Sequence, residues 1–261
     1  MSSTELAILE NADPWDWPED ATEMILSVLG DLKTEEEDRL LAARLAADSL
    51  VMDDAVASAL VATLRDDKQS VELRSQAALS LGPALEAAEL DALVSAADLG
   101  LEGLEHVDLD DTLLSPKMLG EVKRTLRSLY HDAAVPTHVR RRVLEAAVRG
   151  PEDWQEDAVR ASYATGDPAW RLTAVFCMRF LPGFEAQILE SLKNKEHEIF
   201  YEAVLAAGTW AVEGAWEHVS PLLNQTEDRD LLLAAIEVIP ELQPDLADEL
   251  LADFLKSDDE D

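Results

Sequence analysis

Cysteine, glycine, proline and long apolar runs are all scarce in this chain of 261 residues, which has one cysteine, 10 glycines and 11 prolines. The lone Cys177 excludes an intramolecular disulfide and fits a reducing compartment. The longest apolar runs, such as residues 231–236, are far shorter than the ~20 residues needed to cross a bilayer. Residues 1–16 are acidic and show no basic stretch followed by an apolar one, so no secretory signal is recognised. We therefore expect a cytoplasmic protein that does not enter membranes.

Patterns of β-structure and of common enzyme sites are missing as well. No segment shows the two-residue period of a strand, and no Asn-Gly or Asp-Gly turn occurs. A glycine-rich phosphate loop and the His-Glu-x-x-His zinc motif are also absent. The sequence predicts an all-α protein that is not an enzyme, with no catalytic residue, no metal site and no cofactor.

What the chain does contain is a small residue that returns one helical turn after a fixed anchor position. The anchors are Arg39, Arg74, Arg140, Arg171, Phe200 and Leu232. Three residues later stand Ala42, Ala77, Val143, Ala174, Ala203 and Ala235. Four residues later stand Ala43, Ala78, Leu144, Val175, Val204 and Ile236, and seven later Ala46, Leu81, Ala147, Met178, Ala207 and Ile239. Successive anchors are 35, 66, 31, 29 and 32 residues apart, and 66 is two periods. This period indicates a stack of helical hairpins.

The small residues have a physical role in such a stack. Two helices approach closely only where their side chains are small, and larger neighbours then fill the flanking grooves. Apolar residues also recur at spacings of three and four between the anchor segments, as in 184–192. Each unit is therefore expected to be a first helix with the alanine column, followed by a second amphipathic helix.

Three segments resemble the HEAT-repeat family in its short bacterial form. They are Val-Glu-Leu-Arg-Ser-Gln-Ala-Ala-Leu-Ser-Leu-Gly at 71–82, Trp-Arg-Leu-Thr-Ala-Val at 170–175 and Glu-Ala-Val-Leu-Ala-Ala-Gly at 202–208. The resemblance covers roughly residues 34–257 and is close at 71–82 alone. It implies an α-solenoid, a HEAT-like superhelix of about six to seven helical hairpins with one degenerate. It also implies partner binding along the concave surface of the second helices and no catalytic residues.

We expect one solenoid domain over residues 1–261. Its predicted parts are an N-terminal cap (1–33), two repeats (34–97), an irregular insertion or degenerate repeat (98–130), C-terminal repeats (131–256) and an acidic disordered tail (257–261). The insertion ends in a helix from about Pro116 to Tyr130. Its acidic run at 108–111 lacks the order of an EF-hand loop, so a solvated loop is favoured over a calcium site. In the cap, Trp15 and Trp17 are expected to be buried anchors rather than an exposed binding site.

Negative charge dominates, with 55 acidic and 21 basic residues and a formal net charge of −34. The sign reverses at 117–149, where eight basic residues outnumber three acidic ones. The overall field should repel nucleic acids and anionic membranes and attract cationic proteins. The acidity is also consistent with solubility or a salty habitat, which is slightly favoured, and both interpretations stay open.

Two sets of charged residues are candidate contacts. Carboxylates on polar faces of second helices are candidates for a basic partner: Glu156, Asp157, Glu185, Glu190, Glu217 and Asp248. Arginines of the basic segment form a possible anion patch: Arg124, Arg127, Arg140, Arg141 and Arg142. Arginine forks hold phosphates and carboxylates. Because Arg140 shares the anchor position with three other arginines, a structural ladder is favoured over ligand binding. Self-association of this segment with an acidic end is a third possibility.

Single residues with reactive side chains give no active-site pattern. Cys177 lies within a predicted helix with no histidine nearby in sequence, which favours a buried thiol over a nucleophile. His197-Glu198 resembles the pairs that hold two irons in deoxyhypusine hydroxylase, a HEAT-like enzyme that needs several such pairs. One pair is insufficient for a metal site.

Together these patterns predict a non-enzymatic protein-binding scaffold or adaptor. Its acidic concave surface would bind a basic protein or peptide, with a monomer favoured and nucleic acid disfavoured. Two alternatives remain. One is a HEAT-like enzyme of the chromophore-lyase type, which requires a ligand-sized pocket. The other is contact with an anion or a nucleic acid through the basic segment 117–149.

Overall fold

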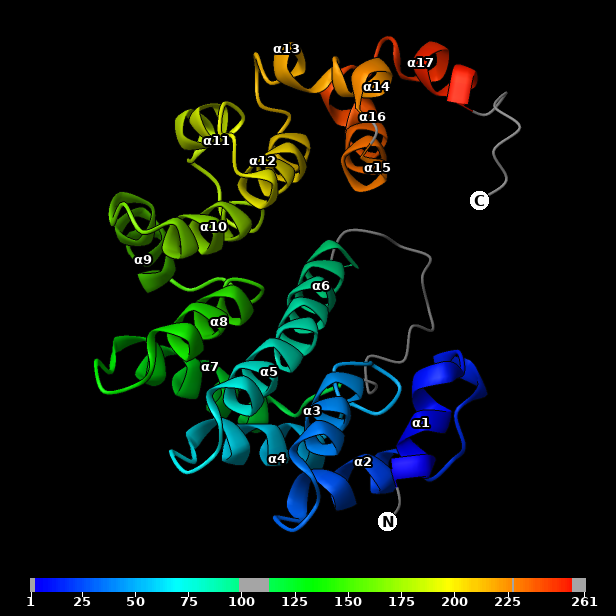
Figure 1. Ribbon diagram of the computed structural model, residues 1–261, viewed down its shortest axis with the longest axis vertical. Helices are drawn as coiled ribbons and strands as arrows, with labels where there is room; N and C mark the ends of the chain where they lie inside the picture. The colour runs from blue at the N-terminus through cyan, green and yellow to red at the C-terminus, as the bar shows by residue number, and fades with distance from the viewer. Residues whose placement is uncertain (1–2, 99–112, 227, 255–261) are drawn as a thin grey trace. The chain divides into compact units, whose positions relative to one another are not determined.

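The computed structural model describes residues 3–98, 113–226 and 228–254 (Figure 1). These residues form helices joined by loops and contain no strand, which confirms the all-α prediction. The chain divides into two compact units, Met1–Gln155 and Glu156–Asp261. The acidic run at 108–111 and the tail at 257–261 lie outside the described residues. The boundaries expected for a single solenoid domain stay a prediction.

The helices of the chain are mostly short. Those of the first unit are α1 (Ser3–Asn11), the 3-10 helix η1 (Pro14–Asp16), α2 (Ala21–Gly30), α3 (Glu36–Leu45), α4 (Asp54–Arg65), α5 (Val71–Ser80), α6 (Gly82–Asp98), α7 (Pro116–His131) and α8 (Thr137–Ala147). The later ones are α9 (Trp154–Ala164), α10 (Pro168–Cys177), α11 (Glu185–Ser191), α12 (His197–Thr209), α13 (Trp216–Val219), α14 (Leu222–Gln225), α15 (Arg229–Glu237), α16 (Ile239–Leu242) and α17 (Ala247–Phe254). The helix expected after the insertion is therefore present as α7.

Helices of the first unit pack in two layers (Figure 1). One layer is the row α3, α5 and α8, and the other is the row α2, α4 and α7. The rows are joined by the contacts α2–α3, α4–α5 and α7–α8. A row of hairpins in which each one contacts its neighbours is the arrangement of an α-solenoid.

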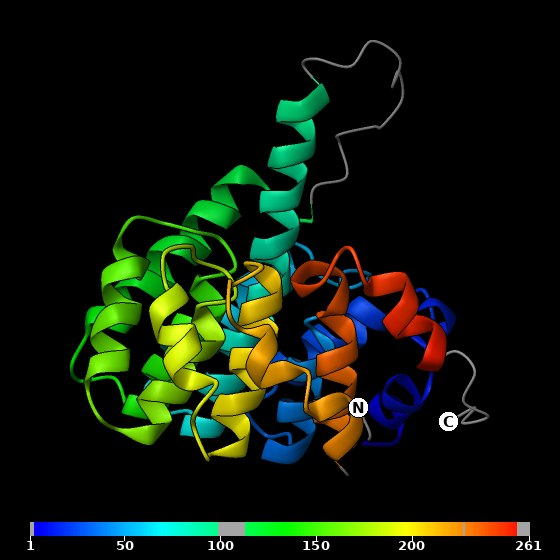
Figure 2. The same cartoon turned by 90° about the horizontal axis from the view of Figure 1, so that it is seen from above.

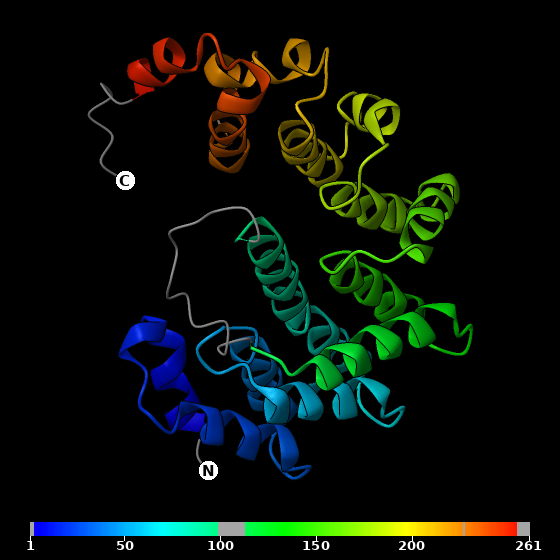
Figure 3. The same cartoon turned by 180° about the vertical axis from the view of Figure 1, so that it is seen from behind.

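The second unit repeats this arrangement. Its alanine helices α10, α12 and α15 form one row, which we call the inner row of this unit, and Figure 3 shows the same row from behind. Here α11 packs on α12, and α14 packs on α15. Beyond α15, α16 contacts both α12 and α15, and α17 packs on α16.

All six segments of the alanine column are helices, and the column is buried. Every column residue is buried except Ile236, which is partly exposed. Gly208 on α12 shows how close neighbouring helices of one row come, because a Cβ added there would lie 2.2 Å from Val238 Cγ1, next to the end of α15. Small residues therefore set the spacing between neighbouring helices, as the sequence predicts.

The order of the two helices within most repeats differs from the prediction. Five of the six alanine helices pack more extensively on the helix before them than on the helix after them, as α5 does on α4 rather than on α6. Helix α10 is the exception, because it packs more on α11 than on α9. The expectation of an alanine helix followed by its partner was therefore wrong for every repeat but that of α10. The period identifies the buried residues, but it does not say which neighbouring helix covers them.

Three anchor arginines hold this pairing in the first unit. Each donates to the carbonyl oxygen ten residues upstream, in the last turn of the preceding helix: Arg39 Nη2 to Leu29 (3.4 Å), Arg74 Nε to Leu64 (3.0 Å) and Arg140 Nε to Tyr130 (2.7 Å). The last carbonyls of a helix have no partner within it, and a cation there also faces the negative end of the helix dipole. The arginine ladder is therefore a series of helix C-terminal caps.

A turn motif precedes every alanine helix. One side chain accepts a hydrogen bond from the backbone N–H two residues later, as Asp66 Oδ1 does from Lys68 (3.0 Å). The turn residues are Asp31, Asp66, Asp132, Thr165, Asn194 and Thr226. Each stands eight residues before its anchor in the first unit and six residues before it in the second. Sequence reasoning missed this motif, although the aspartates were visible.

Helix α6 departs from the two-layer pattern. It follows α5 after Leu81 alone and contacts α5 and α8, and Figure 2 shows it rising beyond the other helices of its unit. Its first residue, Gly82, packs closely on Arg149, because an added Cβ would lie 2.7 Å from Arg149 Cδ. A larger residue at the start of α6 would therefore force the Arg149 side chain to move.

Overpacking the column should destabilise the protein. Ala203 on α12 is fully buried, so Ala203→Leu should lower the free energy of unfolding by about 1–3 kcal/mol. Ala186→Leu on the exposed side of α11 is the matched control and should change it little. Thermal and urea unfolding measure both variants, and equal stabilities would contradict the buried register.

Removing an arginine cap should also destabilise the first unit. Arg74 is 5% exposed, and Arg74→Met would leave the Leu64 carbonyl without its donor, at a cost of about 1–3 kcal/mol. Arg127→Met, at an exposed position of α7, provides the control in the same urea titration. A midpoint for Arg74→Met that matches the control would show that the cap is dispensable.

Candidate functional site

The predicted carboxylates all lie on the surface of the second unit, outside its inner row. Glu156 and Asp157 are on α9, and Glu185 and Glu190 are on α11. Glu217 is on α13 and Asp248 is on α17. All six residues are exposed. They are carried by helices without the alanine column, as expected, although in most repeats the helix without the column precedes the alanine helix.

Side-chain contacts hold α9 next to α11, and these two helices carry four of the six carboxylates. Arg160 on α9 donates to the Gly183 carbonyl (3.1 Å), and its guanidinium lies 4.6 Å from the centre of the Phe184 ring just before α11. Arg160 also pairs with Glu156 at 2.8 Å. Glu217 and Asp248 lie on helices that pack elsewhere, against α14 and α16. The α9–α11 surface, defined here by Glu156, Asp157, Glu185 and Glu190, is therefore the most concentrated part of the set.

Tyr163 fixes the other end of this contact. Its hydroxyl lies 3.3 Å from Ser191 Oγ and 3.4 Å from the Gln187 carbonyl oxygen, and the Arg171 guanidinium lies 5.0 Å from its ring centre. Burial raises the pKa of the Tyr163 phenol above its ordinary value, although the Ser191 hydrogen bond acts in the opposite direction. The phenol therefore stays neutral and holds α9 to α11. Sequence reasoning missed Arg160 and Tyr163, because their partners lie in a different helix.

Charge in this unit is strongly unbalanced. Residues 156–261 contain 23 acidic and seven basic side chains. Asp157, Glu185, Glu217 and Asp248 form no ion pair with any described residue. A cationic ligand would therefore meet carboxylates that are not already neutralised.

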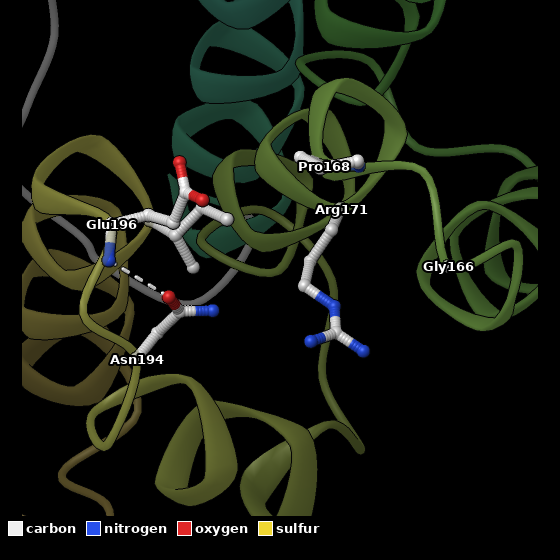
Figure 4. Close-up of a pocket in the computed structure, with 6 residues that line it drawn as sticks. Gly166, Pro168, Arg171, Asn194 and Glu196 are labelled. Atoms are coloured by element: carbon white, nitrogen blue, oxygen red, sulfur yellow. Dashed lines mark hydrogen bonds between the residues drawn. The ribbon is translucent and has the colours of Figure 1, made fainter.

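A small pocket lies between the turns that precede α10 and α12 (Figure 4). It is lined by Gly166, Pro168, Arg171, Asn194, Glu196 and Ile199 and has a volume of about 140 Å³. Asn194 Oδ1 accepts from the Glu196 N–H at 2.9 Å, which is the turn hydrogen bond of this repeat. Pockets for small molecules usually measure about 300–1,000 Å³. This pocket is a gap between two repeat turns and is below the usual size of a substrate chamber.

The predicted anion patch divides into engaged and exposed arginines. Arg140 caps α7 and lies 5.5 Å from the Tyr130 ring centre, and Arg142 pairs with the buried Glu145 at 2.6 Å. Arg141 is 9% exposed. Burial, with Arg142 and Arg141 nearby, lowers the pKa of His138 below its ordinary value. Arg124 and Arg127 on α7 are exposed, so the five arginines do not act as one patch.

Other residues singled out in the sequence occupy structural positions. Cys177 is fully buried at the end of α10, as expected. His197 Nε2 lies 2.7 Å from Asp228 Oδ2 and so links the starts of α12 and α15. In the part of the chain that the structure describes, no three His, Cys, Asp or Glu side chains gather as metal ligands do. None of the helices described there is both long and apolar enough to span a bilayer.

The two N-terminal tryptophans behave differently from each other. Trp17 is half-buried and donates from Nε1 to the carbonyl oxygens of Leu9 (2.9 Å) and Ala12 (3.3 Å), so it anchors the turn after α1. Trp15 is 75% exposed, and the expectation that it is a buried anchor was wrong. Trp15 lies within the 3-10 helix η1, whereas Trp17 is the C-cap residue of that helix, a difference that the sequence does not reveal.

Comparisons with known proteins give structural likenesses without a family. No family model and no curated protein matches the chain. A crystal structure of an engineered protein from the Northeast Structural Genomics Consortium is similar over 87% of this chain and 98% of that one, with 17% identity and a TM-score of 0.46. Human deoxyhypusine hydroxylase in complex with glycerol is similar over 85% and 96%, with 16% identity and a TM-score of 0.36. Likenesses at this level assign no activity.

The acidic end of the stability profile should depend on Asp228. The Leu231 N–H and then His197 hold the pKa of this carboxyl below its ordinary value of 3.8. A depressed folded-state pKa adds stability above the unfolded-state pKa, and this stability is lost as pH falls through the folded value. Asp228→Asn should therefore show a smaller fall in melting temperature from about pH 5 to about pH 3 than the wild type.

Asp157→Asn is the control for this measurement, because Asp157 is exposed on α9 and forms no ion pair with a described residue. Its profile should follow that of the wild type. Identical profiles for Asp228→Asn and the wild type would contradict the role of the charge.

Proposed function

We propose that this protein is a non-enzymatic helical-repeat scaffold that binds a cationic protein or peptide. The binding residues are the predicted carboxylates Glu156, Asp157, Glu185, Glu190, Glu217 and Asp248, with the α9–α11 surface as their centre. The observation that carries this proposal is the exposure of carboxylates on two helices, of which Asp157 and Glu185 form no ion pair with a described residue, while Arg160 and Tyr163 hold the two helices together. Its HEAT-like character and cytoplasmic location are parts of the same proposal.

The support is physical. A surface with one sign of charge raises the local concentration of oppositely charged partners and speeds their encounter. Contacts from α9 to α11 fix the two helices that carry the carboxylates relative to each other, so that no rearrangement of helices is needed when a partner binds. Each exposed ion pair contributes about 0.2–1 kcal/mol, so that affinity requires several carboxylates acting together.

Neutralising the α9–α11 surface tests the proposal. A quadruple variant carries Glu156→Gln, Asp157→Asn, Glu185→Gln and Glu190→Gln. Its affinity for a labelled lysine- and arginine-rich peptide, measured by fluorescence anisotropy, should fall about tenfold, or about 1.4 kcal/mol. Binding to the wild type should also weaken at high salt, because screening shortens the range of the carboxylate field.

The control neutralises four exposed carboxylates of the first unit with the same chemistry: Glu19→Gln, Glu37→Gln, Asp67→Asn and Glu72→Gln. It removes the same net charge and should retain most of the affinity. Equal losses in both variants would mean that the peptide senses only the total charge, and salt-independent binding would exclude these carboxylates as the contact.

A further inference from the structure

Helix α7 carries basic residues along one exposed face. Lys117, Arg124 and Arg127 are all exposed, and a helix with 3.6 residues per turn places them within about 80° of one another. They span ten residues, which corresponds to about 15 Å along the helix axis. We call these three residues the α7 basic face.

Most other arginines of the first unit are already engaged. Those with a carboxylate, amide, carbonyl or ring partner are Arg39, Arg44, Arg65, Arg74, Arg140, Arg142 and Arg149. Arg124 and Arg127 form no hydrogen bond or ion pair with any residue that the structure describes. In a chain with 55 acidic and 21 basic residues, the α7 surface therefore carries two arginines that no described carboxylate neutralises.

Carboxylates on α7, at its C-cap and on α4 already have other partners. Glu121 pairs with Arg65 at 3.2 Å, and Asp132 Oδ1 accepts from the Ala134 N–H at 2.8 Å. Asp54 accepts from the Ser115 N–H (2.8 Å) and hydroxyl (2.6 Å) just before α7 begins, and it also lies close enough to Lys117 to interact with its charge. Asp54 therefore partly offsets Lys117, whereas Arg124 and Arg127 keep their positive charge in a strongly acidic protein.

We propose that the α7 basic face binds a short acidic peptide segment of a partner protein. An extended segment of about five residues covers 15 Å, and arginine forks match carboxylates in geometry as well as charge. The site is separate from the α9–α11 surface and opposite to it in charge. The scaffold would thus hold two partners of different chemistry, and neither proposal requires the other.

A peptide fits this face better than a nucleic acid does. DNA carries one negative charge per about 1.7 Å, so a duplex longer than the 15 Å face would place far more phosphates there than three cations can neutralise. At physiological salt the field of distant carboxylates is screened beyond about 8 Å, so a five-residue segment senses mainly the local cations. The short face therefore selects a short anionic ligand.

The test uses the full chain and a fluorescein-labelled peptide of about six glutamates in a Gly-Ser background, with anisotropy as the readout. The double variant Arg124→Gln, Arg127→Gln should bind it about tenfold more weakly than the wild type. The control is Lys193→Gln, Lys195→Gln, which removes two exposed cations from the second unit and should leave the affinity unchanged. Melting temperatures check that both variants fold.

Three results would overturn the proposal. The first is an equal loss in both variants, which would assign the binding to total charge. The second is tighter binding of a single-stranded DNA of the same charge, which would assign the face to phosphates. The third is a marked gain in affinity when Asp108, Asp110 and Asp111, which lie outside the described residues, are changed to Asn, because the chain's own acidic run would then be the occupant.

Discussion

Close approach between successive alanine helices is the constraint on which the rest of this structure depends. Fully buried small residues such as Ala77 and Ala203 allow neighbouring helices of one row to lie side by side. Gly208 shows the limit of this approach, since even a single carbon would collide with Val238. The helices of the other layer then cover the row, and their outward faces are left for polar residues. The charged surfaces therefore lie on the faces that this packing leaves exposed.

Basic and acidic side chains have different roles in this protein as well as different numbers. The arginines of the first unit mostly cap helices or bridge neighbouring repeats, so much of the scarce positive charge is used for structure. Carboxylates fill the turns and N-caps, where they accept backbone hydrogen bonds, and the surplus remains at the surface. A field of one sign is therefore built without placing unpaired charge in the core, and α7 is a local exception.

The repeat and its buried residues could be predicted from the sequence, because the small residues recur at a helical spacing that depends on one helix at a time. The order of helices within the hairpin could not, because periodicity does not specify the covering neighbour. The exposure of Glu156 and Glu185 follows from the polar side of each helix. Their proximity depends on Arg160 and Tyr163 reaching from α9 to α11, which no single-helix pattern encodes. The exposure of Trp15 could not be predicted either, because the same residue type two positions later, Trp17, is half-buried.

The segment from the turn residue to the anchor has two lengths, eight residues in the first unit and six in the second, so the chain contains two kinds of repeat. Behind the longer turn, an anchor arginine stands ten residues from a helix-ending carbonyl and reaches it. Behind the shorter turn, Arg171 lies over the Tyr163 ring instead, and the next two anchors are apolar. A repeat transplanted without its own turn would carry its anchor to the wrong place. Anyone lengthening the stack by duplication would therefore copy whole repeats of one kind, turn included, rather than exchange helices between the two.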